Sequence, residues 1–395
     1  MGGMKEITCV VTGGGHVGLH ALKEIGQAMR KAGKPFRLIL IDPKPFYVQK
    51  VLLFQPVARA EKIALAWEEV LPERVERIQG ELVTIESQEK RIFFRDAEKK
   101  EQSLDYDLLV ITVGSVVKRP DPEQGGISLH DLSASEEIRT KWRRHLQKAV
   151  NEQDPAERKR LLSVAVAGAG ISGVETSAEL AQAMRSEAAR LGMDPALVRV
   201  FLINAEERLM MNGPKKLGRK LEAKLNNLGV TVLHQRKALY EKDGKLVLSD
   251  GTQLSAGFTI WTLGLEPHPV LRQCQLPLTL EGKVKVDASY RVSGKSAIYS
   301  IGDCAHVIDP ENGKADGMTC KEGILQAKRL GEVIKADLKK KPAPIHRRCR
   351  NFFCISLGQK EGLVWAEYCG IDWILAGKIG RFIRKWTWKK ASNVK

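Results

Sequence analysis

A glycine-rich turn between an apolar segment and an amphipathic segment occurs twice in this chain of 395 residues. The first copy reads Gly13-Gly14-Gly15-His16-Val17-Gly18, and the second reads Gly168-Ala169-Gly170-Ile171-Ser172-Gly173. When such a turn joins a strand to a helix, its backbone N–H groups can approach a pyrophosphate at the helix N-terminus. A single copy would be weak evidence, because glycine turns also serve simply to reverse a chain. The repetition predicts two dinucleotide sites in one protein.

The segments around the two turns follow the same order. In the first copy, apolar strands are expected at 7–11 and 36–42, with a helix over about 17–32 between them. In the second copy, the helix after the turn leads to an apolar strand at 198–204. Near-continuous apolar strands are typical of a parallel sheet that is covered on both faces. We interpret the pattern as an internal duplication of roughly 150 residues.

Later segments indicate how the two copies are arranged. Strands that end in glycine are expected at 107–115 and 258–264, and 296–307 returns to an apolar strand that ends in Gly302-Asp303. The fold class predicted is α/β, with two Rossmann-like three-layer dinucleotide-binding domains, the second inserted in the first, plus a C-terminal region. The predicted boundaries are 1–125 and 290–340 for the first domain, 126–289 for the inserted domain and 341–395 for the C-terminal region.

The cysteines argue against a metal centre or a disulfide framework. The seven cysteines are scattered, odd in number and never spaced as CxxC. No metal site is therefore predicted, and a reducing, cytoplasmic compartment is favoured. No run approaches the ~18–20 apolar residues of a membrane span, and we see no signal-peptide pattern.

The second strand of each copy ends in a different polar residue. Asp42 stands where a carboxylate can accept hydrogen bonds from ribose hydroxyls, although an aspartate before Pro43 could also simply start a turn. In the second copy the residue is Asn204, which does not repel a 2′-phosphate as a carboxylate would, and Arg208 could attract one. The second site is therefore expected to bind a nicotinamide dinucleotide, NADH with NADPH possible.

The paired turns, the strand ends ITVG and WTLG, and the later IGDC together resemble the two-dinucleotide-domain flavoprotein (pyridine nucleotide-disulfide oxidoreductase) superfamily. This resemblance implies FAD in the first turn and NAD(P)H in the second. The implied FAD contacts are Gly13, Gly14, Gly15, His16, Val17, Gly18, Asp42, Thr112, Gly114, Gly302 and Asp303. The implied NAD(P)H contacts are Gly168, Gly170, Ile171, Ser172, Gly173, Asn204 and Gly264.

Within the superfamily, IDPKPFYVQKVLLFQPVA and GISGVETSAEL resemble type II NADH dehydrogenases. The resemblance places Glu175 as a catalytic residue near the flavin, where the nicotinamide stacks. The alternative is a glutamate favoured by the dipole at a helix N-terminus. Residues 43–73 and the inserted domain before Cys274 contain no cysteine, which excludes a dithiol relay. Cys320 and Cys354 are interpreted as small buried hydrophobic residues.

The electron acceptor is less well determined. Cys320-Lys321 replaces the Ala-Gln of the family's quinone-site helix, and Gln326 is displaced, so Gln326 is taken only as a wall residue. The leading hypothesis is an FAD-dependent dehydrogenase that passes hydride from NADH to FAD and then electrons to a quinone. Two alternatives stay open: a soluble oxidoreductase that uses oxygen, a small molecule or an electron-carrier protein, and a non-catalytic nucleotide-sensing flavoprotein.

The net charge of +17 is concentrated toward the end of the chain, where Lys378 to Lys395 contain seven basic residues and no acidic one. Residues 373–390 are predicted to form a basic amphipathic helix that lies on an anionic membrane surface. The expected location is thus cytoplasmic, peripheral on the inner face of the cell membrane. Alternatively the helix docks on the protein body or on a second subunit in a homodimer. Nucleic acid is not expected, since no recognition motif is present. The apolar side of the helix is expected to contain Leu375, Ile379, Phe382, Ile383 and Trp386.

Overall fold

The first apolar segments form a mostly parallel sheet, as strands with both faces covered require. The computed structural model describes residues 5–295 and 297–392. Five strands of this sheet pair in parallel, and two more add an antiparallel extension at one edge. In spatial order the sheet consists of β20 (Ile298–Ser300), β8 (Leu108–Ile111), β1 (Ile7–Thr12), β2 (Phe36–Asp42), β5 (Val75–Glu86), β6 (Arg91–Asp96) and β7 (Glu101–Asp105).

Helices α1 (His16–Ala32) and α8 (Cys320–Leu338) cover one face of this sheet. The two helices pack so closely that a Cβ at Gly331 of α8 would lie only 2.9 Å from the Glu24 carbonyl oxygen of α1. The opposite face carries a second apolar cluster from the antiparallel extension and residues 270–304. The unit therefore has three layers, and the sheet is the middle one.

The second nucleotide unit is built on an all-parallel sheet. Its strands, in spatial order, are β10 (Ile127–Ser128), β17 (Thr259–Trp261), β11 (Ser163–Ala167), β12 (Arg199–Ile203) and β13 (Val230–Leu233). A small antiparallel sheet adds β14 (Ala238–Lys242), β15 (Lys245–Leu248) and β16 (Gln253–Ser255). The helices of this unit are α4 (Leu132–Asn151), α5 (Pro155–Leu161), α6 (Ile171–Arg190) and α7 (Lys215–Asn227).

The C-terminal region forms an antiparallel sheet of β22 (Phe352–Leu357), β23 (Glu361–Tyr368) and β24 (Ile371–Gly377), followed by α9 (Lys378–Ser392). Its buried face, which includes Ile355 and Leu363, joins the apolar core of the second nucleotide unit. Short elements complete the chain: β3 (Tyr47–Val48), β4 (Ala64–Leu65), β9 (Ser115–Val117), β18 (Leu265–Pro267), β19 (Val284–Lys285), β21 (Ala305–His306), α2 (Phe54–Ala58) and α3 (Trp67–Val70).

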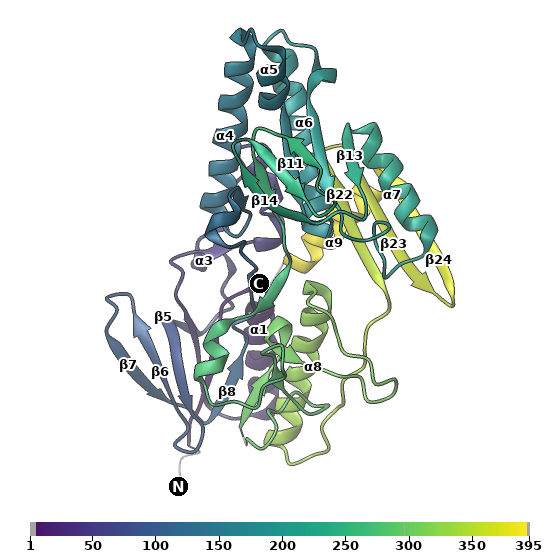
Figure 1. The fold of residues 1–395 in the computed structure, drawn as a ribbon. Coiled ribbons are helices and arrows are strands. Elements are labelled where there is room, and N and C mark those ends of the chain that lie inside the picture. Colours follow the sequence, from purple (N-terminus) through teal and green to yellow (C-terminus); the bar gives the residue numbers. More distant parts are fainter. Residues whose placement is uncertain (1–4, 296, 393–395) are drawn as a thin grey trace.

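The predicted fold class is confirmed: β20, which follows the second unit in sequence, pairs with β8 of the first sheet, so the second unit is inserted in the first. In Figure 1 the two nucleotide units lie one above the other, and α9 reaches the region between them, beside the start of α1. The exact domain boundaries remain a prediction. Among the described residues, no helix is long and apolar enough to cross a membrane.

Candidate functional site

The first glycine turn has the shape of a dinucleotide cradle. Gly13 has a φ of +96°, and a Cβ there would lie 2.5 Å from the Thr112 carbonyl oxygen, so only glycine fits. A Cβ at Gly18 would lie 2.0 Å from the Gly13 carbonyl oxygen. The Thr112 hydroxyl donates to that same carbonyl over 2.8 Å. Apart from the two neighbours of Gly15 in the chain, no described residue has a heavy atom within 4 Å of a Cβ built there, which leaves open space where a pyrophosphate would lie.

The side chains around this turn are buried and specifically held. Asp42 is 8% exposed and accepts hydrogen bonds from the backbone N–H groups of Gly14 and Lys44, at 2.7 and 2.9 Å. The Nδ1 atom of His16 lies 3.3 Å from the Tyr47 hydroxyl, and its buried Nε2 has no hydrogen-bond partner in residues 5–295 and 297–392. Burial, followed by repulsion from His20, lowers the pKa of His16 to about 4, so the ring is neutral at neutral pH.

The Gly302-Asp303 turn completes this end of the site. Gly302 has a φ of +79° and packs against Val17 of the first turn. Asp303 accepts a hydrogen bond from the Ser115 hydroxyl at 2.6 Å, just after Gly114. Sequence reasoning did not identify Lys50, whose ammonium interacts with the carboxylates of Asp42 and Asp303. The residues present therefore fit a dinucleotide such as FAD.

Gln326 does not line a pocket as the sequence had suggested. It is 2% exposed, its Oε1 accepts from the Gly302 N–H at 2.8 Å, and its Nε2 donates to Asp316 at 2.8 Å. Gln326 therefore fixes the backbone of the Gly302-Asp303 turn from behind. Lys321, which lies earlier in α8, instead donates a hydrogen bond to the Arg350 carbonyl.

The second turn repeats the geometry of the first. Gly168 has a φ of +112°, and a Cβ there would lie 2.4 Å from the Thr262 carbonyl oxygen. A Cβ at Gly173 would lie 1.9 Å from the Gly168 carbonyl oxygen, to which the Thr262 hydroxyl donates over 2.8 Å. Thr262 was missed, although its place in the duplicated strand end matches that of Thr112. Gly170 again faces open space.

The rim of the second turn is more accessible than that of the first. Ile171 is 39% exposed, and Gly170 and Ser172 are also exposed. Gly264 lies after β17 with a φ of +89° and open space at its Cβ position, and its carbonyl accepts from the Lys118 N–H. The predicted NAD(P)H contacts of the turn thus surround an open surface.

Asn204 has its side chain turned into the protein. It is 5% exposed, its Nδ2 lies 2.9 Å from His234 Nδ1 and 3.0 Å from the Glu206 carbonyl, and its Oδ1 accepts from the Glu206 N–H. Arg208 directs its guanidinium at the carbonyls of Met210, Met211 and Gly213. These contacts occupy the donors that could otherwise have attracted a 2′-phosphate.

Glu175, five residues into α6, meets the C-terminal region. Its side chain is buried and accepts hydrogen bonds from the Ser356 N–H at 2.8 Å and from Arg384 Nη2 at 3.4 Å. Burial raises the pKa of Glu175 to about 7, and the Arg384 charge acts against this rise. Sequence reasoning missed Ser356 and Arg384, which are distant in sequence. Glu179, one turn later, pairs with Arg59 at 2.6 Å.

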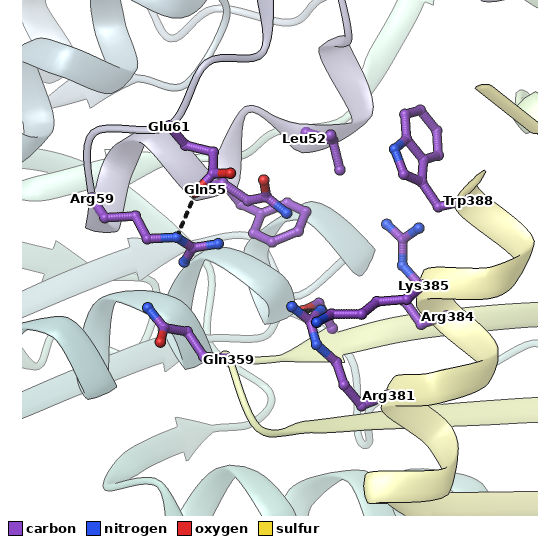
Figure 2. A pocket seen from close by; sticks show the side chains of 11 residues that line it. Leu52, Gln55, Arg59, Glu61, Gln359, Arg381, Arg384, Lys385 and Trp388 are labelled. Atoms are coloured by element: carbon purple, nitrogen blue, oxygen red, sulfur yellow. Dashed lines mark hydrogen bonds and ion pairs between the residues drawn. The ribbon is translucent and has the colours of Figure 1, made fainter. Parts of the chain in front are cut away.

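A pocket of about 400 Å³ lies beside Arg384, between α2, β22 and α9. Figure 2 shows the α9 side chains on one wall and Arg59, Glu61 and Gln359 on the opposite wall. Its lining residues are Leu52, Phe54, Gln55, Arg59, Glu61, Ser356, Gln359, Arg381, Arg384, Lys385 and Trp388. The pocket touches both nucleotide units, because Arg384 contacts Glu175 and Trp388 contacts His16.

The predicted helix over 373–390 is wrong in its first part. Residues Ile371–Gly377 form strand β24, and the helix begins at Lys378. Leu375 is therefore not on the helix, although Ile379, Phe382 and Trp386 do form an exposed apolar stripe on α9. Ile383 lies off this stripe and is half-buried.

The opposite side of α9 docks on the protein body. The Trp388 ring stacks on His16 with centroids 5.7 Å apart, and His20 Nε2 lies 2.8 Å from the Ala391 carbonyl oxygen. Arg381 donates to the Ser356 hydroxyl at 2.9 Å. One side of the helix thus closes the site while the other faces outward.

The cysteines near the pocket have inert thiols. Burial raises the pKa of Cys320 to about 11 and also raises that of Cys354. Reactive cysteines have lowered pKa values, so neither thiol has the character of a reactive group. Both residues are half-buried rather than fully buried as predicted, and Cys354 Sγ lies 3.4 Å from the Thr387 hydroxyl. Within the described ranges, no group of His, Cys, Asp and Glu residues is arranged to hold a metal ion.

The family model described as pyridine nucleotide-disulphide oxidoreductase matches residues 7–328. The type II NADH:quinone oxidoreductase of Staphylococcus aureus is 23% identical over 391 residues, which cover 95% of this chain and 92% of the relative. The demethylphylloquinone reductase of Synechocystis sp. is 25% identical over 344 residues, which cover 84% of this chain and 80% of the relative.

Among solved structures, NDH2 from Plasmodium falciparum in complex with NADH superimposes with a TM-score of 0.81 at 19% identity, over 98% of this chain and 94% of that one. This likeness supports the fold alone. The resemblance found in the sequence, to the superfamily and to type II NADH dehydrogenases, is confirmed by the family match and the named relatives.

Proposed function

The chain belongs to the pyridine nucleotide-disulphide oxidoreductase family, and on this premise we propose that it is an FAD-dependent NAD(P)H dehydrogenase that passes electrons to a quinone. The observation that carries the proposal is the pair of matching cradles, one packed against other side chains and one open. A resident flavin needs the first kind of site, and a nucleotide that comes and goes needs the second. Relatives named as quinone reductases support the choice of acceptor.

The chain's own residues bind and orient the two nucleotides. The backbone of Gly13 to Gly18 would hold the FAD pyrophosphate and Asp42 its ribose, while Gly168 to Gly173 would hold that of NAD(P)H. When bound, FAD supplies the chemistry, since it accepts a hydride from the nicotinamide and gives two electrons onward. Glu175, with a pKa of about 7, can hold or release a proton at Oε1 beside Arg384.

The outward side of the C-terminal region supports contact with a membrane surface. Phe382 is 71% exposed, and Ile379, Trp386 and Trp373 are also exposed, beside the basic residues of α9. Aromatic and basic side chains together are typical of helices that lie at the headgroups of anionic bilayers. Each basic residue near such a surface adds about 1 kcal/mol of attraction.

The function is tested by NADH oxidation. The purified FAD-loaded protein is given NADH under oxygen-free conditions, with and without a short-chain menaquinone, and the loss of NADH absorbance is followed. We expect rapid steady turnover only when the quinone is present. Flavin that is reduced by NADH but not reoxidised by the quinone would refute the proposed acceptor, and flavin that NADH does not reduce would refute the dehydrogenase.

Membrane contact is tested by co-sedimentation with vesicles that contain phosphatidylglycerol. The double variant Phe382→Ser/Trp386→Ser should lose most of the binding because it removes the exposed apolar stripe. Leu280→Ser, a fully exposed leucine far from α9 in the sequence, is the matched control and should bind as the wild type does. Equal binding by all three proteins would remove the membrane role.

A further inference from the structure

The pocket beside α9 has an unbalanced charge. It is lined by the cations Arg59, Arg381, Arg384 and Lys385 and by one acid, Glu61. Arg59 is neutralised by Glu61 at 2.8 Å and by Glu179 at 2.6 Å, and Arg384 pairs with Glu175. The other two cations of the pocket have no carboxylate partner among the residues that the structure describes.

Those two cations are Arg381 and Lys385, one helical turn apart on α9. Arg381 donates only to the Ser356 hydroxyl, and its buried Nε has no partner among the described residues. Lys385 makes no hydrogen bond or ion pair within the part of the chain that the structure describes. Burial lowers the pKa of Arg381, and repulsion from Arg59 and Arg384 adds to this effect although Glu179 opposes it. An anion between the two side chains would relieve this repulsion.

The remaining walls have a different chemistry. Leu52, Phe54 and Trp388 offer apolar and aromatic surface, and Gln55 and Gln359 offer amide groups. Gln359 makes a backbone hydrogen bond to Gln182, which leaves its side-chain amide available for a ligand. Aromatic walls, a few polar groups and unpaired cations are together typical of a site for a compact aromatic acid.

We propose that this pocket binds an aromatic ligand that bears a negatively charged substituent, with Arg381 and Lys385 holding the charge and Trp388 and Phe54 contacting the ring. The proposal rests on the proposed function in one respect: the natural ligand is an electron acceptor of the quinone class that carries an acid group. In the reaction NADH and one proton reduce this quinone to its hydroquinone and leave NAD⁺, so two electrons and two protons reach the ring. Uncharged quinones such as menaquinone are still reduced, but with a lower kcat/KM than a quinone that carries an acid group.

Binding is tested without turnover on the FAD-loaded full-length protein. Calorimetry at low ionic strength compares 2-naphthoate, which cannot accept electrons here, with the neutral 2-naphthamide of the same shape. We expect the acid to bind at least about ten-fold more tightly. Lys385→Glu and Arg381→Gln should each remove most of that preference. Lys389→Glu, which changes the same charge on an exposed lysine outside the pocket, should retain it.

Two results would overturn the proposal: equal affinity for the two ligands in the wild type, or a preference that Lys385→Glu leaves intact. Flavin content is measured by absorbance in every variant. Loss of FAD from Lys385→Glu would also overturn the proposal, because the cations would then serve the flavin phosphates.

Turnover separates this inference from the proposed function. The values of kcat/KM for 1,4-naphthoquinone-2-sulfonate and for 1,4-naphthoquinone are measured in the wild type, Lys385→Glu and Lys389→Glu. The ratio of charged to neutral quinone should fall at least about ten-fold in Lys385→Glu alone. Turnover of both quinones with an unchanged ratio would defeat the inference only. Naphthoate binding without turnover of any quinone would defeat the proposed function, and with it the quinone identity of the natural ligand, but not the site for an aromatic anion.

Discussion

The two glycine turns have nearly the same backbone but different surroundings. In each, a threonine hydroxyl from a neighbouring strand donates over 2.8 Å to the carbonyl of the first glycine. In each, the last glycine approaches that carbonyl so closely that no Cβ fits. The first turn, however, is covered by Trp67, Tyr47 and Trp388, whereas Ile171 and its neighbours in the second are exposed. This difference supports our proposal that the first cradle retains its nucleotide and the second exchanges it.

A second parallel lies just beyond the last glycine of each turn. His20 of α1 and Glu175 of α6 stand at equivalent positions, two residues after the last glycine of each turn. Both are buried, and both are bound by the C-terminal region, His20 at the Ala391 carbonyl and Glu175 at Ser356 and Arg384. The C-terminal region therefore contacts the duplicated units at corresponding points.

The largest expected effect comes from adding a methyl group to the last glycine of each turn. Gly18→Ala places a Cβ 2.0 Å from a backbone oxygen and should yield protein without FAD. Gly173→Ala creates the same clash at 1.9 Å but should leave FAD bound and raise the KM for NADH at least about ten-fold. Flavin absorbance and NADH kinetics distinguish the two. Gly26→Ala, with ordinary contacts in α1, is the control, and FAD retained by Gly18→Ala would break the comparison.

Replacing Glu175 by glutamine should flatten the pH dependence of stability. The raised pKa of about 7 means that the folded state binds this proton more tightly than the unfolded state. The resulting contribution to the free energy of unfolding is about 3 kcal/mol. It is fully present below the ordinary pKa of a glutamate and is lost as the pH rises through 7.

Thermal unfolding of the FAD-loaded protein at pH 5 and pH 8 measures this effect. The midpoint of the wild type should fall more between the two pH values than that of Glu175→Gln. In the variant His20→Gln, which changes the corresponding residue of α1, the fall in midpoint that depends on Glu175 should persist. Identical pH profiles for wild type and Glu175→Gln would contradict the prediction.

Introducing a carboxylate at the end of the second strand of the second unit should sharpen its choice of nucleotide. Asn204→Asp gives the second unit the residue that Asp42 supplies in the first, and the added charge repels a 2′-phosphate. We expect the ratio of kcat/KM for NADPH to that for NADH to fall about ten-fold. Stopped-flow reduction of the flavin by NADPH and by NADH measures this preference. Asn226→Asp, at the end of α7, adds the same charge elsewhere and should change the ratio little.

The smallest expected effect concerns the cover over the first turn. Trp388→Ala removes the ring that stacks on His16 and should speed FAD dissociation by about three- to ten-fold, since a stacked aromatic pair contributes about 0.5–1.5 kcal/mol. FAD fluorescence after dilution follows the release. Trp386→Ala, an exposed tryptophan on the other side of α9, should release FAD at the wild-type rate. Equal rates in both variants would mean that α9 does not retain the flavin.

The sequence was sufficient for features whose cause is local. A glycine turn between strand and helix is dictated by sterics within a few residues, so both cradles and the inserted architecture could be predicted. The contact of Glu175 with Arg384 joins residues 209 positions apart and could not be read from any short pattern. The same holds for Asn204, whose side chain turns inward because His234, at the end of the next strand, offers it a partner.

The misassigned start of α9 had a local signal that helical spacing obscured. Cys369 and Gly370 both have positive φ values, 51° and 73°, and form the two-residue turn of a hairpin between β23 and β24. Ile371 to Leu375 then alternate across the strand that this turn begins. The apolar spacing from Leu375 to Ile379 fits a helix equally well. Gly370 was the feature that could have distinguished a strand from a helix here.

The return of β20 to the first sheet has a consequence for biosynthesis. Its Ser300 pairs with Ile111 of β8, so the flavin-site sheet gains this strand only after the inserted unit has left the ribosome. Synthesis proceeds at roughly 5–20 residues per second, and domains fold as units when they emerge. The second nucleotide unit can therefore fold first, while the earlier half of the first unit waits with an unpaired strand edge at β8. A chaperone that protects this edge, or free flavin that binds early, would act in that interval.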